Sequence, residues 1–332
     1  MKIDAFCHIM PRPYYDRFFT LPETVHATNL RKRVANIPCL VDMDVRFAQM
    51  DEFGDYRQLI NICAPPVEDL GPPGISREMA RIGNEALAEL VRSHPDRFAG
   101  FCACVPMDDP DAAVAELEYA TSELGAVGAQ IYTHVHGEAM DAARFDPFYE
   151  AAARSGALVQ VHPCRSSAWA DYPTEKRSRY EIWWTFGWEY DLSAFMARIV
   201  FSGVLERYPD LKLLIHHGGS MVPHFSGRVG PGWDQLGART PPGQQADIEG
   251  YPLSRRSSIS ARCTATRPCS GPPTRCAAAS TSTAPTTSCS ARTARSTRSA
   301  GPATSARRSR TWRRSGSARR RRKPSSAATS PA

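Results

Sequence analysis

The stretch Leu211–Arg228 reads LKLLIHHGGSMVPHFSGR, and it decides the predicted fold. Its first five residues form a short and mostly apolar run after a Tyr-Pro-Asp sequence, which is typical of a strand buried on both faces of a parallel sheet. Gly218 and Gly219 then allow a tight turn. His216 and His217 are adjacent, so on a strand their side chains point to opposite faces. We therefore expect at most one of them to enter a given site.

The composition divides the chain into two unlike parts. All 34 Asp and Glu lie within residues 1–253, whereas 18 of the 41 Lys and Arg lie in residues 254–332. The formal charge is therefore −11 for the first part and +18 for the second. The second part has only Ile259 and Trp312 as large apolar residues, too few to bury a core. We predict an incomplete barrel in residues 1–253 and a disordered, low-complexity basic tail in residues 254–332.

The cysteines and the N-terminus predict a cytoplasmic protein. Six of the ten cysteines lie in residues 1–253, mostly in or beside apolar runs, as reduced core cysteines do. No cysteine spacing resembles a zinc ribbon. The opening sequence MKIDAFCHIMPRP lacks the apolar run of a signal peptide, and no apolar stretch approaches a membrane span. We expect no membrane partner.

The first part of the chain repeats a pattern of apolar run, loop and helical segment. Strands are predicted at residues 2–8, 56–63, 98–105, 127–132, 157–162 and 211–217, and helices near 41–53, 75–93, 145–154 and 192–206, with a further helix from 109. This alternation predicts an α/β fold, with a parallel sheet and helices packed outside. Six such units indicate a (β/α)8 TIM-like barrel that lacks its last one or two strands.

Histidines follow three of the predicted strands. His8 ends the first, His162 the fifth and His217 the sixth. The carboxyl ends of the strands carry the active site in barrels of this type. Three such coincidences favour a functional site over three independently packed histidine rings.

Four ordered segments carry a family resemblance. They are IDAFCHIMP (3–11), GAVGAQIYTH (125–134), FDPFYEAAARSGALVQVHP (145–163) and LERYPDLKLLIHHGG (205–219). The chain resembles the amidohydrolase-related proteins of the amidohydrolase superfamily, in the branch that contains aminocarboxymuconate-semialdehyde decarboxylase and gamma-resorcylate decarboxylase. The resemblance covers about residues 1–253. It implies a barrel of the metal-dependent hydrolase type that holds a divalent metal ion, Zn2+ or Mn2+.

The resemblance also implies roles for the histidines. His8 and His162 match metal ligands, as suits a neutral imidazole at a strand end. His217, five residues after Lys212, matches the acid/base histidine beside a metal-bound water. His216 is then expected to point away from the site, into packing or a supporting hydrogen bond. Phe6 stands where the family has the first histidine of a pair, so the ligand set departs from the family pattern.

Two arginines match positions that hold substrate carboxylates in the resembling decarboxylases. Arg228 lies eleven residues after His217, and Arg46 lies in the segment VRFAQMDEFG. A guanidinium binds a carboxylate through two hydrogen bonds, so the pair suits an acidic substrate. The alternative for both arginines is a salt bridge on a helix surface.

Other polar and aromatic features are less specific. His134 and His136 have metal-like spacing, but we favour a loop or substrate contact for them. Trp183, Trp184 and Trp188 are expected to wall an apolar pocket. Alternatively, this Trp-rich segment covers the barrel mouth or forms the contact of a homodimer.

These features predict a metal-dependent non-oxidative decarboxylase (carboxy-lyase) for an unsaturated or aromatic carboxylic acid. The expected partner is a small-molecule carboxylate. Hydrolysis of a lactone, amide or ester is the leading alternative, because the same metal and water serve that reaction. A nucleic-acid binder that uses the basic run Arg319–Lys323 ranks lowest.

The composition of the tail indicates a reading-frame error. One possible coding sequence for CTATRPCSG (263–271) reads HGDTALFG from its third base. A possible coding sequence for TSCSARTARST (287–297) reads VVLGTDGPFD in the same shifted frame. Both products resemble the family segments expected for strands seven and eight. The family's metal-binding aspartate would then be encoded across Arg292 and Thr293, so the chain as written lacks it and we expect it to be impaired.

DNA sequencing tests the frameshift. We expect one inserted or deleted base near the codons for residues 252–260, and low solubility of the chain as written. A confirmed in-frame reading, together with a soluble and folded basic-tailed protein, would contradict the hypothesis.

Overall fold

The computed structural model describes residues 1–233, 235–244, 248 and 276–278. It divides into compact units at Met1–Arg292 and Thr293–Ala332, and the second lies entirely outside the described residues. Most of the predicted basic tail also lies outside them, so its boundary at residue 253 stays a prediction. Among the described residues, no helix is long and apolar enough to cross a membrane.

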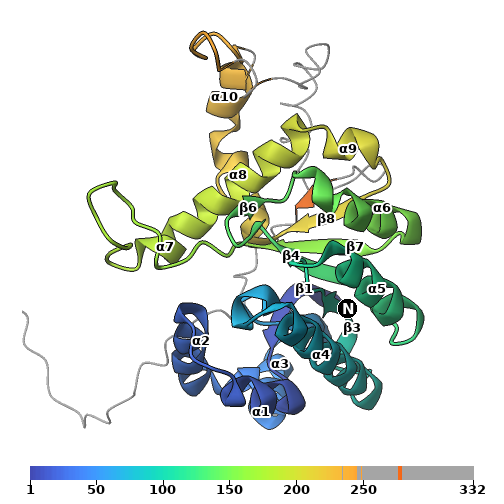
Figure 1. The fold of residues 1–332 in the computed structure, drawn as a ribbon. Helices are drawn as coiled ribbons and strands as arrows, with labels where there is room; N and C mark the ends of the chain where they lie inside the picture. Colours follow the sequence, from blue (N-terminus) through green and yellow to red (C-terminus); the bar gives the residue numbers. More distant parts are fainter. Residues whose placement is uncertain (234, 245–247, 249–275, 279–332) are drawn as a thin grey trace, which may run out of the picture. The chain divides into compact units, whose positions relative to one another are not determined.

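The described core is a parallel sheet with the strand order β1-β2-β3-β4-β7-β8-β9 (Figure 1). The strands are β1 (Lys2–Ile9), β2 (Tyr56–Ile62), β3 (Phe98–Cys104), β4 (Gly128–Tyr132), β7 (Leu158–His162), β8 (Lys212–Ile215) and β9 (Cys276–Ala278). A small hairpin, β5 (His134–Val135) and β6 (Glu138–Ala139), follows β4. Within the described residues the sheet is open between β9 and β1, in agreement with the predicted incomplete barrel.

Helices alternate with the strands of this sheet (Figure 1). The helices are α1 (Arg12–Thr20), α2 (Val25–Asn36), α3 (Met43–Asp51), α4 (Pro73–Ser93), α5 (Pro110–Ser122), α6 (Asp146–Ser155), α7 (Ile182–Thr185), α8 (Gly187–Phe201), α9 (Val204–Arg207) and α10 (Val222–Trp233). Short 3-10 turns lie at η1 (Pro38–Leu40), η2 (Val67–Leu70), η3 (Ala143–Phe145) and η4 (His216–Gly219). The predicted strands and helices are largely confirmed. Helices α1 and α2 lie between the first predicted strand and the first predicted helix, in a segment for which no helix was predicted.

Side chains alternate along the strands between a face packed against the helices and a polar face. On β7, Val159 and Val161 belong to the hydrophobic cluster that α5, α6 and α8 help to form. Gln160 and His162 occupy the alternate positions, and both are buried. Because successive strand side chains point to opposite faces, they project away from that cluster. Polar side chains of the sheet are therefore brought together on its inner face.

Arg46 on α3 is buried, which contradicts the alternative of a salt bridge on a helix surface. It is 0% exposed, and it donates hydrogen bonds to Gln58 Oε1 at 2.8 Å and to the carbonyl oxygens of His8 and Cys39, each at 3.0 Å. These contacts join α3 to β1, β2 and η1. We therefore assign Arg46 a structural role here, and its predicted contact with a substrate carboxylate stays a prediction.

Replacing Arg46 tests this structural role. Arg46→Met leaves buried acceptors without a donor, so we expect the free energy of unfolding to fall by at least about 2 kcal/mol. Urea denaturation measures the change. The control is Arg92→Met on α4, where an exposed side chain pairs with Glu89, and a change within about 0.5 kcal/mol is expected. Equal effects of the two substitutions would contradict the structural role of Arg46.

Candidate metal centre

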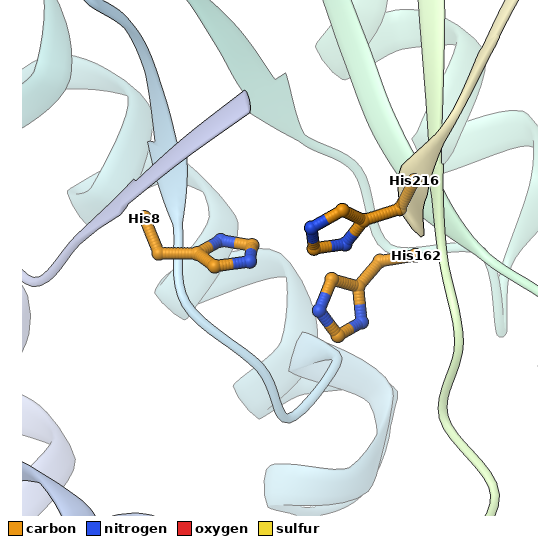
Figure 2. A group of neighbouring side chains, drawn as sticks. All are labelled: His8, His162 and His216. Carbon is orange, nitrogen blue, oxygen red and sulfur yellow. The ribbon is translucent and has the colours of Figure 1, made fainter. Parts of the chain in front are cut away.

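Three histidines converge at the carboxyl ends of their strands (Figure 2). His8 comes from β1, His162 from β7, and His216 follows β8 directly. Their ring centroids are 4.9 Å apart for His8 and His162, 5.4 Å for His8 and His216, and 4.7 Å for His162 and His216. One nitrogen from each ring lies within 4.8 Å of the others. This geometry can hold a metal ion after a small contraction, because zinc–imidazole bonds are about 2.0–2.1 Å.

Burial keeps all three rings neutral. Burial, together with the positive charge of Arg33, lowers the pKa of His8 to about 3. Burial also holds the pKa values of His162 and His216 well below the usual range, and the neighbouring histidines add to both shifts. A neutral imidazole has the free lone pair that a metal requires. The cluster therefore consists of ligands in the correct protonation state near neutral pH.

The hydrogen bonds of the cluster fit a metal ion. His162 Nδ1 lies 2.6 Å from the Pro163 carbonyl oxygen, which can only accept, so Nδ1 donates and Nε2 keeps its lone pair. Within the described part of the chain, His8 Nε2 and His216 Nδ1 are buried without a hydrogen-bond partner. Buried polar atoms rarely remain unpaired. A bound cation would satisfy these nitrogens, so the residues present fit a divalent metal.

The expectation that His216 points away from the site is wrong. Leu213 and Ile215 pack in the outer cluster with the helices, so alternation turns His216 to the inner face. There its ring stacks on Phe6, with centroids 4.1 Å apart and planes 6° apart. The ring of Phe6, at the position where the resemblance implies a histidine ligand, therefore supports the ring of His216.

His217 lies beside this cluster rather than within it. The strand ends at Ile215, and His217 adopts a left-handed conformation with φ 52°. Its ring centroid is 6.4 Å from that of His162, and its Nδ1 lies 2.5 Å from Glu189 Oε1. Burial alone would raise the pKa of Glu189, but the hydrogen bond with His217 lowers it overall. His217 therefore has a carboxylate partner close to the three-histidine cluster, and its acid/base role stays a prediction.

Arg228 is found at a pocket that the clustered histidines do not line. It is exposed on α10 and lines an open pocket with Val229, Gln235 and Arg239, and the three clustered histidines are not part of that pocket. Its predicted contact with a substrate carboxylate stays a prediction.

Arg33 on α2 was missed by the sequence analysis, and its positive charge acts on His8. It lines a small pocket with Arg165, Trp183 and Trp188, and Trp188 contacts His162 with centroids 5.4 Å apart. Arg33 is half-buried, and in the described part of the chain it has no hydrogen bond or ion pair. Two of the three tryptophans expected to wall a pocket, Trp183 and Trp188, thus line one that also contains a cation, whereas Trp184 is exposed and is not part of it. Its volume of about 40 Å³ holds little more than one water, so a larger ligand requires the tryptophans to move.

A second group of possible metal ligands already takes part in hydrogen bonds within the protein. His134, Cys164 and Asp191 lie close together. His134 Nδ1 accepts from the Gly137 backbone, and Asp191 accepts from the Cys164 backbone at 3.2 Å and from the Thr133 hydroxyl. These bonds indicate a structural group. The prediction of a loop contact for His134 agrees with the stacking of its ring on Trp169.

The parallel sheet, its surrounding helices and the histidine cluster define an incomplete α/β barrel with a metal-competent site. The family model for amidohydrolases matches residues 3–251, so the chain belongs to the amidohydrolase family.

Related sequences have names that describe decarboxylases. A gamma-resorcylate decarboxylase of Polaromonas sp. is 32% identical over 216 residues, which cover 60% of this chain and 61% of that protein. The 2-amino-3-carboxymuconate-6-semialdehyde decarboxylase of Dictyostelium discoideum is 27% identical over 193 residues, covering 58% of this chain and 52% of that protein. The chain thus spans about half to three fifths of the length of these two curated relatives.

Solved structures support the fold. A 5-carboxyvanillate decarboxylase of Sphingomonas paucimobilis gives a TM-score of 0.66 at 24% identity, with 83% of this chain and 79% of that chain covered. A dihydroxybenzoic acid decarboxylase of Polaromonas sp. gives 0.57 at 27% identity, with 79% and 76% covered, and that structure contains manganese and the inhibitor 2-nitroresorcinol. The predicted family and barrel class are confirmed.

The depressed pKa values predict a loss of stability in acid. For His8 the unfolded chain takes up a proton near pH 6.5, whereas the folded protein does so only near pH 3. Between these values the unfolded state binds more protons, so stability falls as pH falls, by up to about 1.4 kcal/mol per pH unit for such a group. We expect the free energy of unfolding of the metal-free protein, measured by urea denaturation, to fall less between pH 6.5 and 5 in His8→Gln than in wild type. An equal dependence of the free energy of unfolding on pH in the two proteins would contradict the buried, neutral state of His8.

Proposed function

We propose that the site supports metal-dependent, non-oxidative decarboxylation of an aromatic or unsaturated carboxylic acid. The observation that carries the proposal is the cluster of neutral His8, His162 and His216 beside a tryptophan-lined pocket. The names of the related decarboxylases support the same reaction class. These three histidines would hold the metal, Zn2+ or Mn2+. When bound, the metal would supply Lewis-acid stabilisation of negative charge on a substrate oxygen.

The side chains around the cluster have separate roles in this proposal. Arg33 would bind the substrate carboxylate or a ring oxygen, since a half-buried guanidinium without an observed partner is suited to an anion. Trp183 and Trp188 would contact the faces of the ring and exclude water. His217 would deliver the proton that replaces the departing carbon dioxide, and Glu189 would orient it.

The conditions and partners of the reaction follow from the same features. We infer a small-molecule carboxylate substrate and a cytoplasmic location, which the six buried, free cysteines of the described residues support. A second copy of the chain is the proposed protein partner. Exposed Tyr172, Tyr180 and Phe186 in the Trp-rich segment are consistent with it.

An assay of carbon dioxide release tests the proposed reaction. The chain as written and a frame-restored version would receive gamma-resorcylate with Mn2+, Zn2+ or a chelator. We expect metal-dependent release from the frame-restored protein and much slower release from the chain as written. Failure of the metal-loaded, frame-restored protein to decarboxylate any of a panel of aromatic acids, or hydrolysis of an ester or lactone instead, would contradict decarboxylation.

The same assay tests the role of Arg33. Loss of a charged hydrogen bond costs about 1.5–3 kcal/mol, so Arg33→Met should raise KM by roughly 10- to 100-fold. Lys32→Met is the matched control, because Lys32 is the exposed preceding residue of α2. Equal KM values for the two variants would exclude Arg33 from the carboxylate site.

A further inference from the structure

A continuous chain of hydrogen bonds runs behind His8. Gln160 Nε2 lies 2.6 Å from the Ala5 carbonyl oxygen, and Gln160 Oε1 lies 2.5 Å from Asn61 Nδ2. Asn61 Oδ1 in turn lies 2.7 Å from His8 Nδ1. Asn61 and Gln160 are both 0% exposed, so solvent does not compete for these groups. This series of hydrogen bonds therefore constrains which atom of each side chain faces its neighbour.

The backbone carbonyl of Ala5 sets the direction of the whole chain. A carbonyl oxygen only accepts, so Gln160 must turn its amide nitrogen to Ala5 and its oxygen to Asn61. That oxygen also only accepts, so Asn61 must turn its nitrogen to Gln160 and its oxygen to His8. His8 Nδ1 must then carry the proton. Amide orientations and histidine tautomers are assigned from such networks, and here one fixed acceptor determines each member.

This direction decides which nitrogen of His8 is available. With Nδ1 protonated and the ring neutral, the lone pair is on Nε2. Nε2 is also the atom that is buried and has no hydrogen-bond partner among the described residues. Figure 2 shows the ring of His8 directed toward His162 and His216. The opposite tautomer would place an N–H at this position and could not bind a cation through it.

The strand register explains how this series of hydrogen bonds forms. His8 and Asn61 are paired positions on the adjacent strands β1 and β2. Gln160 lies on β7, which is not a neighbour of β2 in the sheet, so its bond to Asn61 crosses between nonadjacent strands. On the next strand, β4, the residue paired with Gln160 is Gln130, another buried amide. Gln130 donates to the Ile62 carbonyl oxygen and to the Tyr132 hydroxyl, and it takes no part in the chain to His8.

We propose that Asn61 and Gln160 are positioning residues that hold His8 as its Nδ1–H tautomer and so present the Nε2 lone pair to a divalent cation. The part that concerns the cation rests on the proposed function. The tautomer itself is a property of the metal-free protein and is measured separately. Loss of such outer partners of a ligating histidine typically weakens metal binding by about 10- to 100-fold.

Nitrogen NMR of the 15N-histidine-labelled, metal-free full chain tests the tautomer. For His8, assigned by the signal that disappears in His8→Gln, we expect a protonated Nδ1 and an unprotonated Nε2 near neutral pH. In Gln160→Leu the nitrogen of Asn61 loses its acceptor, so the amide is free to reverse and the Nε2–H tautomer should gain population. Gln160→Glu retains an acceptor for Asn61 and should retain the wild-type tautomer.

Zinc affinity gives the second readout, and Gln130→Leu is the matched control. We expect the Kd for Zn2+ to rise about 10- to 100-fold in Gln160→Leu, and to change less than about threefold in Gln130→Leu. A wild-type His8 protonated on Nε2 overturns the proposal even if every variant fails to fold. An unchanged tautomer in folded Gln160→Leu also overturns it. If the tautomer behaves as expected but the wild type binds no zinc, the positioning role stands and the metal-dependent function fails.

Discussion

The structure depends on one constraint, which is that polar side chains on the inner face of a buried parallel sheet must be satisfied by one another. The outward positions of the strands are occupied by apolar residues that pack under the helices. The alternate positions carry His8, Asn61, Gln160 and His162, and all of them are buried. Unpaired polar groups are costly in such an environment. The amides therefore bond to each other, and the histidine nitrogens that remain face a common point.

This arrangement gives a role to Phe6, which stands where the family resemblance implies a histidine. Phe6 cannot coordinate a metal, yet it stacks on His216 and so helps to orient another imidazole toward His8 and His162. The three clustered ligands are all neutral histidines, and the loss of the aspartate ligand that the family resemblance implies stays a prediction. A site of neutral ligands places more positive charge on a bound cation than a carboxylate-containing site does.

The sequence was sufficient for the strands, for most of the helices and for the positions of His8 and His162, because period-two burial and strand-end placement are local signals. His216 was assigned wrongly because the family spacing selected His217, whereas the alternation of Leu213 and Ile215 already favoured the opposite choice. The roles of Asn61 and Gln160 required the tertiary structure. Their contacts join residues 53 and 99 positions apart, and no local pattern specifies such contacts. Arg33 was missed for the same reason, since it lies on α2, a helix that was not predicted.

X-ray absorption of the zinc-loaded full chain tests the central claim most directly, because it reports the ligands of the metal itself. The account predicts one Zn2+ per chain in an environment dominated by imidazole. His216→Phe should remove one imidazole from the spectrum, and His217→Phe should remove none. Stoichiometric zinc with an unchanged spectrum in His216→Phe, or the loss of an imidazole only in His217→Phe, would contradict the three-histidine site.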